Sequence, residues 1–94
     1  MKRVYLSAPM TGVPDLNREW FTIMEELARA KGYEVVTPLS VVQTNDWLDM
    51  VIQGLQALKT CDIIFLHPDW EKSAGCRVEE TVARRIGLKI LHSR

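Results

Sequence analysis

Glu79 is the side chain of this sequence with the clearest potential for covalent chemistry. It follows residues 73–75, where we expect a helix to begin. A helix N-terminus favours a charged carboxylate by about 0.3–1 kcal/mol, and an ionised carboxylate aimed into a pocket can attack the anomeric carbon of a sugar. The alternative is an acid that only complements the helix dipole. Glu80 fits that alternative better, because it points about 100° further round the helix.

A second candidate site is the small-residue segment 73–75 itself, Ser-Ala-Gly. Its hydroxyl and free backbone N–H groups suit a phosphate, and Ser7, Thr11 and Gly12 in an earlier loop could complete a cradle for the anion. The alternative is that Ser73 is an ordinary N-cap. The earlier loop lacks the spacing of either glycine-rich phosphate fingerprint.

Aromatic side chains offer a third kind of contact. The hydroxyl of Tyr5 could orient a carboxylate or a substrate, although a tyrosine in a strand more often serves in packing. Trp70 lies in the loop after an expected strand and is the better candidate for stacking on a base. Trp20 and Trp47 are expected in the core.

Two other classes of site fit the sequence less well. Ser7, His67 and Asp69 allow a hydrolase triad, but no nucleophile-elbow spacing is present. A phosphorylated receiver domain would need acids at the end of the first strand, where this chain has Tyr5-Leu6-Ser7.

The elements that must position these side chains alternate along the chain. Short apolar runs predict strands at residues 4–6, 33–37, 62–66 and 88–91. Apolar residues three or four apart predict three helices between them, the first capped by Asn17. The expected inward faces are Trp20, Met24, Leu27 and Ala28, then Leu48, Val51, Ile52, Leu55 and Leu58, then Val78, Val82 and Ile86.

This alternation predicts one α/β domain over residues 1–94, a three-layer α/β/α sandwich with a four-stranded parallel sheet. Right-handed crossovers leave few topologies, and the flavodoxin-like strand order 2-1-3-4 is the simplest. Its switch point lies between the first and third strands. The loops at residues 7–16 and 67–75 should therefore face each other across the crevice where ligands bind.

Composition narrows the possible partners. Twelve basic residues balance twelve acidic ones, so nothing steers the chain to nucleic acid or membrane. No apolar run approaches the roughly 20 residues of a membrane span, and the start does not resemble a signal peptide. We therefore expect a cytoplasmic protein in which Cys61 and Cys76 are free thiols. No cofactor is expected, and the spacing of cysteines and histidines does not predict a metal site.

Two separated motifs, YLSAPMTG at residues 5–12 and SAGCRVE at residues 73–79, resemble the nucleoside 2-deoxyribosyltransferase-like superfamily. LKTCD at residues 58–62 and PDWEKSAGC at residues 68–76 resemble its small, uncharacterised phage and bacterial branch. The resemblance covers almost the whole chain. It implies an enzyme that makes or breaks N-glycosidic bonds of deoxynucleosides or nucleotides, with Glu79 as the nucleophile and Tyr5 as a further catalytic residue.

The resemblance also implies a substrate class. Transferases of free nucleosides usually carry an acid six residues before the glutamate, where this chain has Ser73. The nucleoside 5′-monophosphate hydrolases of the superfamily use serine there to hold phosphate. This favours hydrolysis over transfer, through a covalent glycosyl-Glu79 intermediate. The residues expected to bind substrate are Ser7, Ala8, Pro9, Met10, Thr11, Gly12, Asp69, Trp70, Ser73 and Gly75.

Two departures from the superfamily pattern keep an alternative open, a catalytically inactive nucleotide-binding or regulatory module. Gly54 stands where many members carry an aspartate that helps to hold or protonate the base, so we expect Gly54→Asp to increase base release. The full-length transferases also continue past the fourth strand and lend a residue to a neighbouring subunit's site, whereas this sequence ends at Arg94. The resemblance nevertheless implies a homodimer or a larger homo-oligomer.

Overall fold

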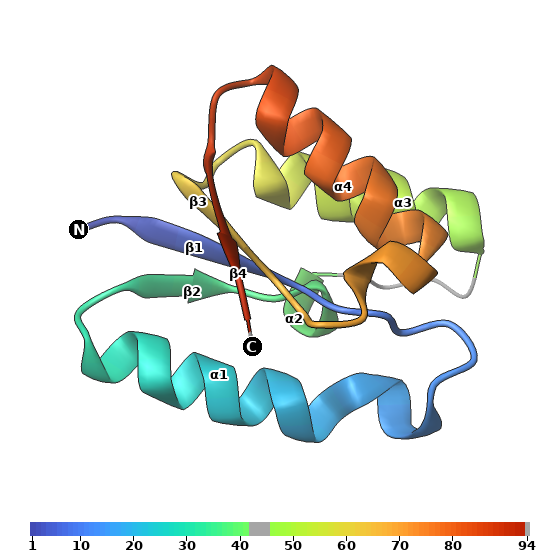
Figure 1. Ribbon diagram of the computed structural model, residues 1–94, viewed down its shortest axis with the longest axis horizontal. Coiled ribbons are helices and arrows are strands. Elements are labelled where there is room, and N and C mark those ends of the chain that lie inside the picture. The colour runs from blue at the N-terminus through green and yellow to red at the C-terminus, as the bar shows by residue number, and fades with distance from the viewer. Residues whose placement is uncertain (42–45, 94) are drawn as a thin grey trace.

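The computed structural model describes residues 1–41 and 46–93 of the chain (Figure 1). Within these residues, strands and helices alternate largely as the sequence predicts. The elements are β1 (Arg3–Ser7), α1 (Arg18–Ala30), β2 (Glu34–Val36), α2 (Pro38–Val41), α3 (Trp47–Leu58), β3 (Ile63–Leu66), α4 (Ala74–Arg85) and β4 (Lys89–His92). The short helix α2 was not predicted. It begins at Pro38, whose fixed φ suits the first position of a helix.

The four strands form one parallel sheet with the order β2-β1-β3-β4. Tyr5 on β1 lies opposite Val36 on β2 and Ile64 on β3. The predicted fold class and strand order are therefore confirmed. No helix within residues 1–41 and 46–93 is long and apolar enough to cross a membrane.

The helices form two layers, with α1 on one face of the sheet and α3 and α4 on the other (Figure 1). Val4 and Leu6 of β1 belong to the core cluster that contains Phe21 of α1. Tyr5 belongs to the opposite cluster, together with Leu58 of α3 and Ala83 of α4. Because successive side chains of a strand point to opposite faces, the α3–α4 face receives Tyr5 and, two residues later, Ser7.

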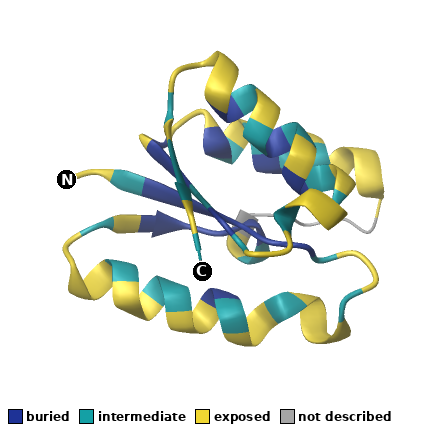
Figure 2. Cartoon of the chain, viewed as in Figure 1, coloured by how far each residue is buried: buried dark blue, intermediate teal, exposed yellow. Residues whose placement is uncertain are grey.

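Some apolar residues that were predicted to face the core are exposed (Figure 2). In α1, Leu27 is 54% exposed and Phe21 is buried instead. Leu27 lies about 120° round the helix from Phe21, so both residues cannot face the sheet. Leu48 and Ile52 of α3 and Ile86, which follows α4, are exposed for the same reason, since only a narrow arc of each outer helix touches a small sheet.

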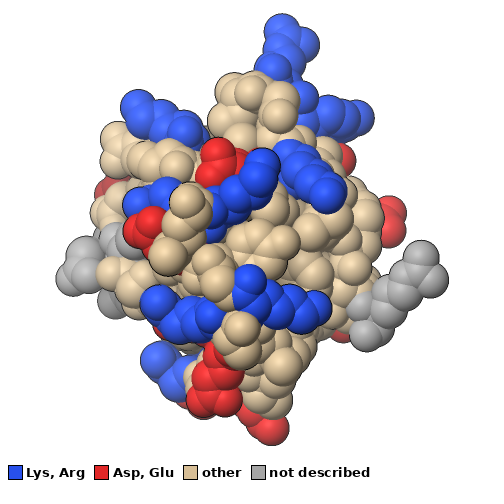
Figure 3. All heavy atoms as spheres, turned by 90° about the vertical axis from the view of Figure 1, so that its left-hand side faces the viewer, with Lys and Arg blue, Asp and Glu red and all other residues tan. Residues whose placement is uncertain are grey.

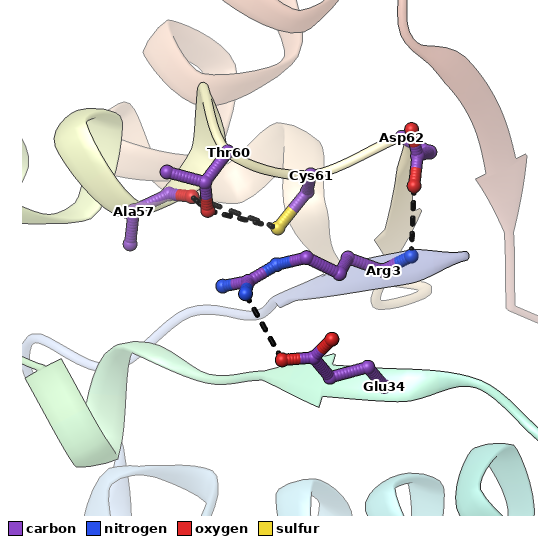
Figure 4. A network of polar contacts seen from close by, with 6 residues as sticks. All are labelled: Arg3, Glu34, Ala57, Thr60, Cys61 and Asp62. Carbon is purple, nitrogen blue, oxygen red and sulfur yellow. Dashed lines mark hydrogen bonds and ion pairs between the residues drawn. The ribbon is translucent and has the colours of Figure 1, made fainter. Parts of the chain in front are cut away.

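Polar contacts align the amino ends of the first three strands (Figure 4). The backbone N–H of Arg3 donates to Oδ2 of Asp62 at 2.9 Å, just before β3. The Arg3 guanidinium donates to Glu34 at the start of β2, also at 2.9 Å. Exposed ion pairs of this kind add little stability, but together with the backbone bond they join three segments that are distant in sequence. This edge lies opposite the predicted site.

Candidate active site

The carboxyl ends of β1 and β3 meet at one edge of the sheet, as the topology predicts. Ser7 and Leu66 are paired across the ladder, and the N–H of His67 donates to the Ser7 carbonyl at 2.8 Å. A cavity of about 460 Å³ opens between the loops that follow them. Its volume falls within the range of roughly 300–1,000 Å³ that is typical of small-molecule sites.

Most of the residues predicted to bind substrate line this cavity. Those that line it are Ala8, Pro9, Met10, Thr11, Asp69, Ser73 and Gly75, together with Glu79. Tyr5 and Ser7 do not line it but contact Glu79 directly. Gly12 is exposed, and neither it nor Trp70 is among the described residues that line the cavity.

Glu79 projects from the second turn of α4 and is only 8% exposed. The Tyr5 hydroxyl donates to its Oε2 at 2.6 Å, and the Ser7 hydroxyl donates to its Oε1 at 2.7 Å. Hydrogen bonds from a hydroxyl to a carboxylate are typically this short when the acceptor is charged. Because side chains alternate along β1, the hydroxyl groups of Tyr5 and Ser7 both reach the Glu79 carboxylate. Ser7 was predicted to line the cavity, but it contacts Glu79 instead.

Burial raises the pKa of Glu79 above its ordinary value of 4.5, and the two hydroxyl donors offset this only in part. Burial thus shifts the pKa of Glu79 in the direction opposite to that expected from the helix N-terminus. The helix dipole acts within the first turn, and desolvation dominates in the second. Burial and the neighbouring Glu79 also raise the pKa of Tyr5 well above 10.0, so its hydroxyl stays protonated as a donor.

Helix α3 passes close to this carboxylate at Gly54. A Cβ atom built there would lie 2.8 Å from Oε2 of Glu79 and 2.9 Å from the Tyr5 hydroxyl. Real Cβ atoms essentially never approach other atoms this closely. The site thus draws on three elements, β1, α3 and α4.

One wall of the cavity is apolar and comes from α3. Trp47, Met50 and Val51 line it. The prediction that Trp47 belongs to the core is wrong, since it is 45% exposed and lies in the first turn of α3 beside the crevice. Trp70 packs against the core cluster of the α3–α4 face instead. The aromatic ring available for stacking is therefore that of Trp47.

His67 lines the cavity, as expected for the first residue of the loop at 67–75, although it was not predicted to bind substrate. Nδ1 of His67 accepts a hydrogen bond from the Asp69 N–H at 2.9 Å, and burial lowers the pKa of His67. A neutral ring with an acceptor at Nδ1 carries its proton on Nε2. Because the Ser7 hydroxyl donates to Glu79, the structure does not join Ser7, His67 and Asp69 in a triad.

The chain matches, over residues 2–92, the family model described as "Domain of unknown function (DUF4406)". The chain belongs to the DUF4406 family. A search of curated proteins found no match for this DUF4406 chain.

Among solved structures, the DUF4406 chain is similar to "2-desoxiribosyltransferase from Leishmania mexicana", with a TM-score of 0.79 and 19% sequence identity. The match covers 98% of this chain but only 63% of the other. The DUF4406 chain therefore has the fold of a deoxyribosyltransferase over less than two thirds of that protein's length. The fold implied by the motifs at residues 5–12 and 73–79 is confirmed, whereas the phage and bacterial branch stays a prediction.

The start of α4 gives the DUF4406 site its polar end. Ser73 caps the helix, since its hydroxyl oxygen accepts from the Cys76 N–H at 3.2 Å. This confirms Ser73 as an N-cap and leaves its hydroxyl hydrogen able to donate. The N–H groups of Ala74 and Gly75 lie in the first turn, where no intrahelical acceptor exists. Lys72, beside Asp69 at 3.5 Å, is the lysine that lines the cavity.

Within residues 1–41 and 46–93, no other lysine or arginine lines the cavity. Figure 3 views the face where the chain's N-terminus lies, and Lys and Arg gather there. Lys31 and Lys59 directly follow α1 and α3, and Arg85 is the last residue of α4. At these positions cations complement the negative ends of the helix dipoles. An anion in the cavity would therefore depend on hydrogen bonds more than on charge. Among the residues that the structure describes, no three His, Cys, Asp or Glu side chains cluster as metal ligands would.

Proposed function

We propose that this DUF4406 protein hydrolyses the N-glycosidic bond of a nucleoside 5′-monophosphate, with Glu79 as the nucleophile. The observation that carries the proposal is a buried carboxylate at the cavity wall that accepts one hydroxyl hydrogen bond on each oxygen. Each oxygen keeps a further lone pair for attack. A carboxylate held rigidly beside a cavity of this size is suited to nucleophilic catalysis at a sugar carbon.

The reaction has two displacements. A carboxylate oxygen of Glu79 forms a bond to C1′ while the bond from C1′ to the base nitrogen breaks, and the base leaves with the electron pair and takes up a proton. A water oxygen then bonds to C1′, the ester bond to Glu79 breaks, and the water gives up a proton. Tyr5 and Ser7 donate to the carboxylate, so they position it before attack and stabilise its charge when it is released.

The two ends of the cavity suit the two ends of a nucleotide. The apolar wall of Trp47, Met50 and Val51 offers a surface for the base. The Ser73 hydroxyl, with the N–H groups of Ala74 and Gly75, offers donors for a phosphate. Lys72 can add a charge-assisted contact. A less specific proposal is that the protein catalyses glycosyl transfer between nucleosides. The similarity to a deoxyribosyltransferase supports this proposal.

Incubation with a panel of nucleoside 5′-monophosphates and the matching free nucleosides, followed by chromatography for released base, tests the proposal. We expect release from the monophosphates and almost none in the Glu79→Gln variant, which should still bind nucleotide. Glu80→Gln is the matched control, because Glu80 pairs with Arg84 of the same helix and is not among the described residues that line the cavity. Equal base release by wild type and Glu79→Gln would exclude the covalent mechanism.

A nucleotide-binding module without turnover is the second candidate. The burial of Glu79 favours it, since desolvation disfavours the charged form of the carboxyl group that a nucleophile requires. Nucleotide binding measured by calorimetry, without base release at any pH between 5 and 9, would select this function. If none of the nucleotides raises the Tm of the protein, both candidate functions are excluded.

A further inference from the structure

Gly54 occupies a position in the site where a Cβ atom would crowd two side-chain oxygen atoms. It lies in the middle of α3 and is buried. Its backbone is helical, so no left-handed conformation requires glycine there. Glycine is also a poor helix former. The reason for glycine at this position is therefore space, namely the 2.8 Å and 2.9 Å from its hypothetical Cβ to Glu79 and Tyr5.

Neither neighbour of Gly54 can withdraw easily. The Tyr5 ring is fully buried on the central strand of the sheet, in the same cluster as Leu58 and Ile64. Glu79 is held from its other oxygen by Ser7 at 2.7 Å. Close-packed interiors tolerate added atoms poorly. A methyl group at position 54 would consequently separate the Tyr5 hydroxyl from Oε2 of Glu79.

We infer that Gly54 is a positioning residue, whose missing side chain leaves the space in which the hydrogen bond between Tyr5 and Glu79 forms. Its catalytic consequence rests on the proposed function, but the steric requirement does not. The earlier expectation for Gly54→Asp is thereby corrected. An aspartate there would displace Glu79 and bring two carboxylates together, so base release should fall.

The central test compares Gly54→Ala in two backgrounds by thermal unfolding. In the wild-type background the substitution should lower the Tm. In the Tyr5→Phe, Glu79→Ala background both oxygen atoms are absent, and the same substitution should raise the Tm because alanine is the better helix former. Gln56→Ala, at an exposed position of α3, is the control and should change both backgrounds alike. A higher Tm for Gly54→Ala in both backgrounds would overturn the inference.

A second readout follows Glu79 itself. The hydrogen bond from Tyr5 lowers the pKa of Glu79, so the loss of that bond in Gly54→Ala should move the ¹³C NMR titration of the Glu79 carboxyl group to higher pH. An unchanged titration would overturn the inference. If Gly54→Ala does not fold in the wild-type background, folding in the double-variant background supports the inference, and failure in both overturns it.

Base release separates this inference from the proposed function. Where the wild type is active, displacement of Glu79 should reduce kcat by about 10²-fold, with a much smaller change in KM. If the wild type releases no base while the reversal in Tm is observed, the proposed function fails and the role of Gly54 stands.

Discussion

At the scale of single residues, Glu79 combines two opposed requirements. Its proposed role as nucleophile requires a charge, whereas burial disfavours the charged form and raises the pKa of this side chain. Tyr5 and Ser7 reduce the conflict by donating one hydrogen bond each. The site consequently has a cost in stability that should be measurable without any substrate.

Glu79→Gln should be more stable than the wild type at neutral pH. Because the folded pKa of Glu79 is raised, the unfolded chain ionises first as the pH increases, so the wild type loses stability from pH 4.5 upwards until the folded pKa is passed. Glutamine does not titrate. The difference in Tm between the two proteins should therefore grow between pH 4 and pH 7. Each kcal/mol of difference in the free energy of unfolding corresponds to about 4–8 °C in Tm. A difference that does not change with pH would show that Glu79 is not destabilised by burial.

Ser7→Ala should weaken base release and shift its pH dependence. Removal of a donor to the charged carboxylate costs about 1.5–3 kcal/mol, which corresponds to roughly a tenfold to hundredfold loss. The pKa of Glu79 should rise further, since the Ser7 hydroxyl lowers it. The acidic limb of a plot of kcat against pH should then move to higher pH. Ser93→Ala, beyond β4, provides the control, and a limb that does not move in Ser7→Ala would contradict the assignment.

At the scale of elements, the N-terminus of α4 combines one observed role with one proposed role. Ser73 caps the helix, and the same residue is proposed to bind phosphate. Aspartate is also a good N-cap, whereas alanine costs about 0.5–2 kcal/mol. Substitution of Ser73 by these two residues therefore distinguishes folding from binding.

Ser73→Asp should keep the Tm but weaken monophosphate binding by like-charge repulsion, while Ser73→Ala should lower the Tm. Binding of the free nucleoside should be much less affected by Ser73→Asp, because its sugar carries no phosphate. Calorimetry with a nucleoside and its 5′-monophosphate measures both effects. Unchanged affinity of Ser73→Asp for the monophosphate would place the phosphate elsewhere.

At the scale of the whole molecule, a small sheet leaves apolar side chains uncovered. Leu48 is 58% exposed and Ile52 is 44% exposed on α3, the helix that also forms the apolar wall of the cavity. We propose that this face takes part in a homodimer or larger assembly, since a chain of this size buries a smaller fraction of its surface than a large one does.

Light scattering at micromolar concentration should accordingly report more than one chain per particle. Ile52→Lys should reduce the particle mass to that of a monomer, because a charge in an apolar interface is desolvated without a partner. Lys59→Glu, at the other end of α3, should not change the mass. A wild-type monomer at this concentration would contradict the proposal.

The sequence by itself was sufficient for the fold and for the location of the cavity. The alternation of apolar runs and helical stripes, with the right-handedness of crossovers, led to the order β2-β1-β3-β4. That order brings the ends of β1 and β3 together, so Glu79 and Ser73 could be assigned to one cavity. These are properties of local periodicity and chain connectivity, which a sequence contains directly.

Only the tertiary structure decided how the side chains act. Periodicity does not determine which of two neighbouring positions on a helix faces inward, so Trp47 was predicted in the core and lies beside the cavity. Desolvation depends on everything that surrounds a group, so the raised pKa of Glu79 was not predicted. Gly54 was taken for a missing acid, because the approach of α3 to a carboxylate on α4 is a distance between elements and is not encoded in local spacing.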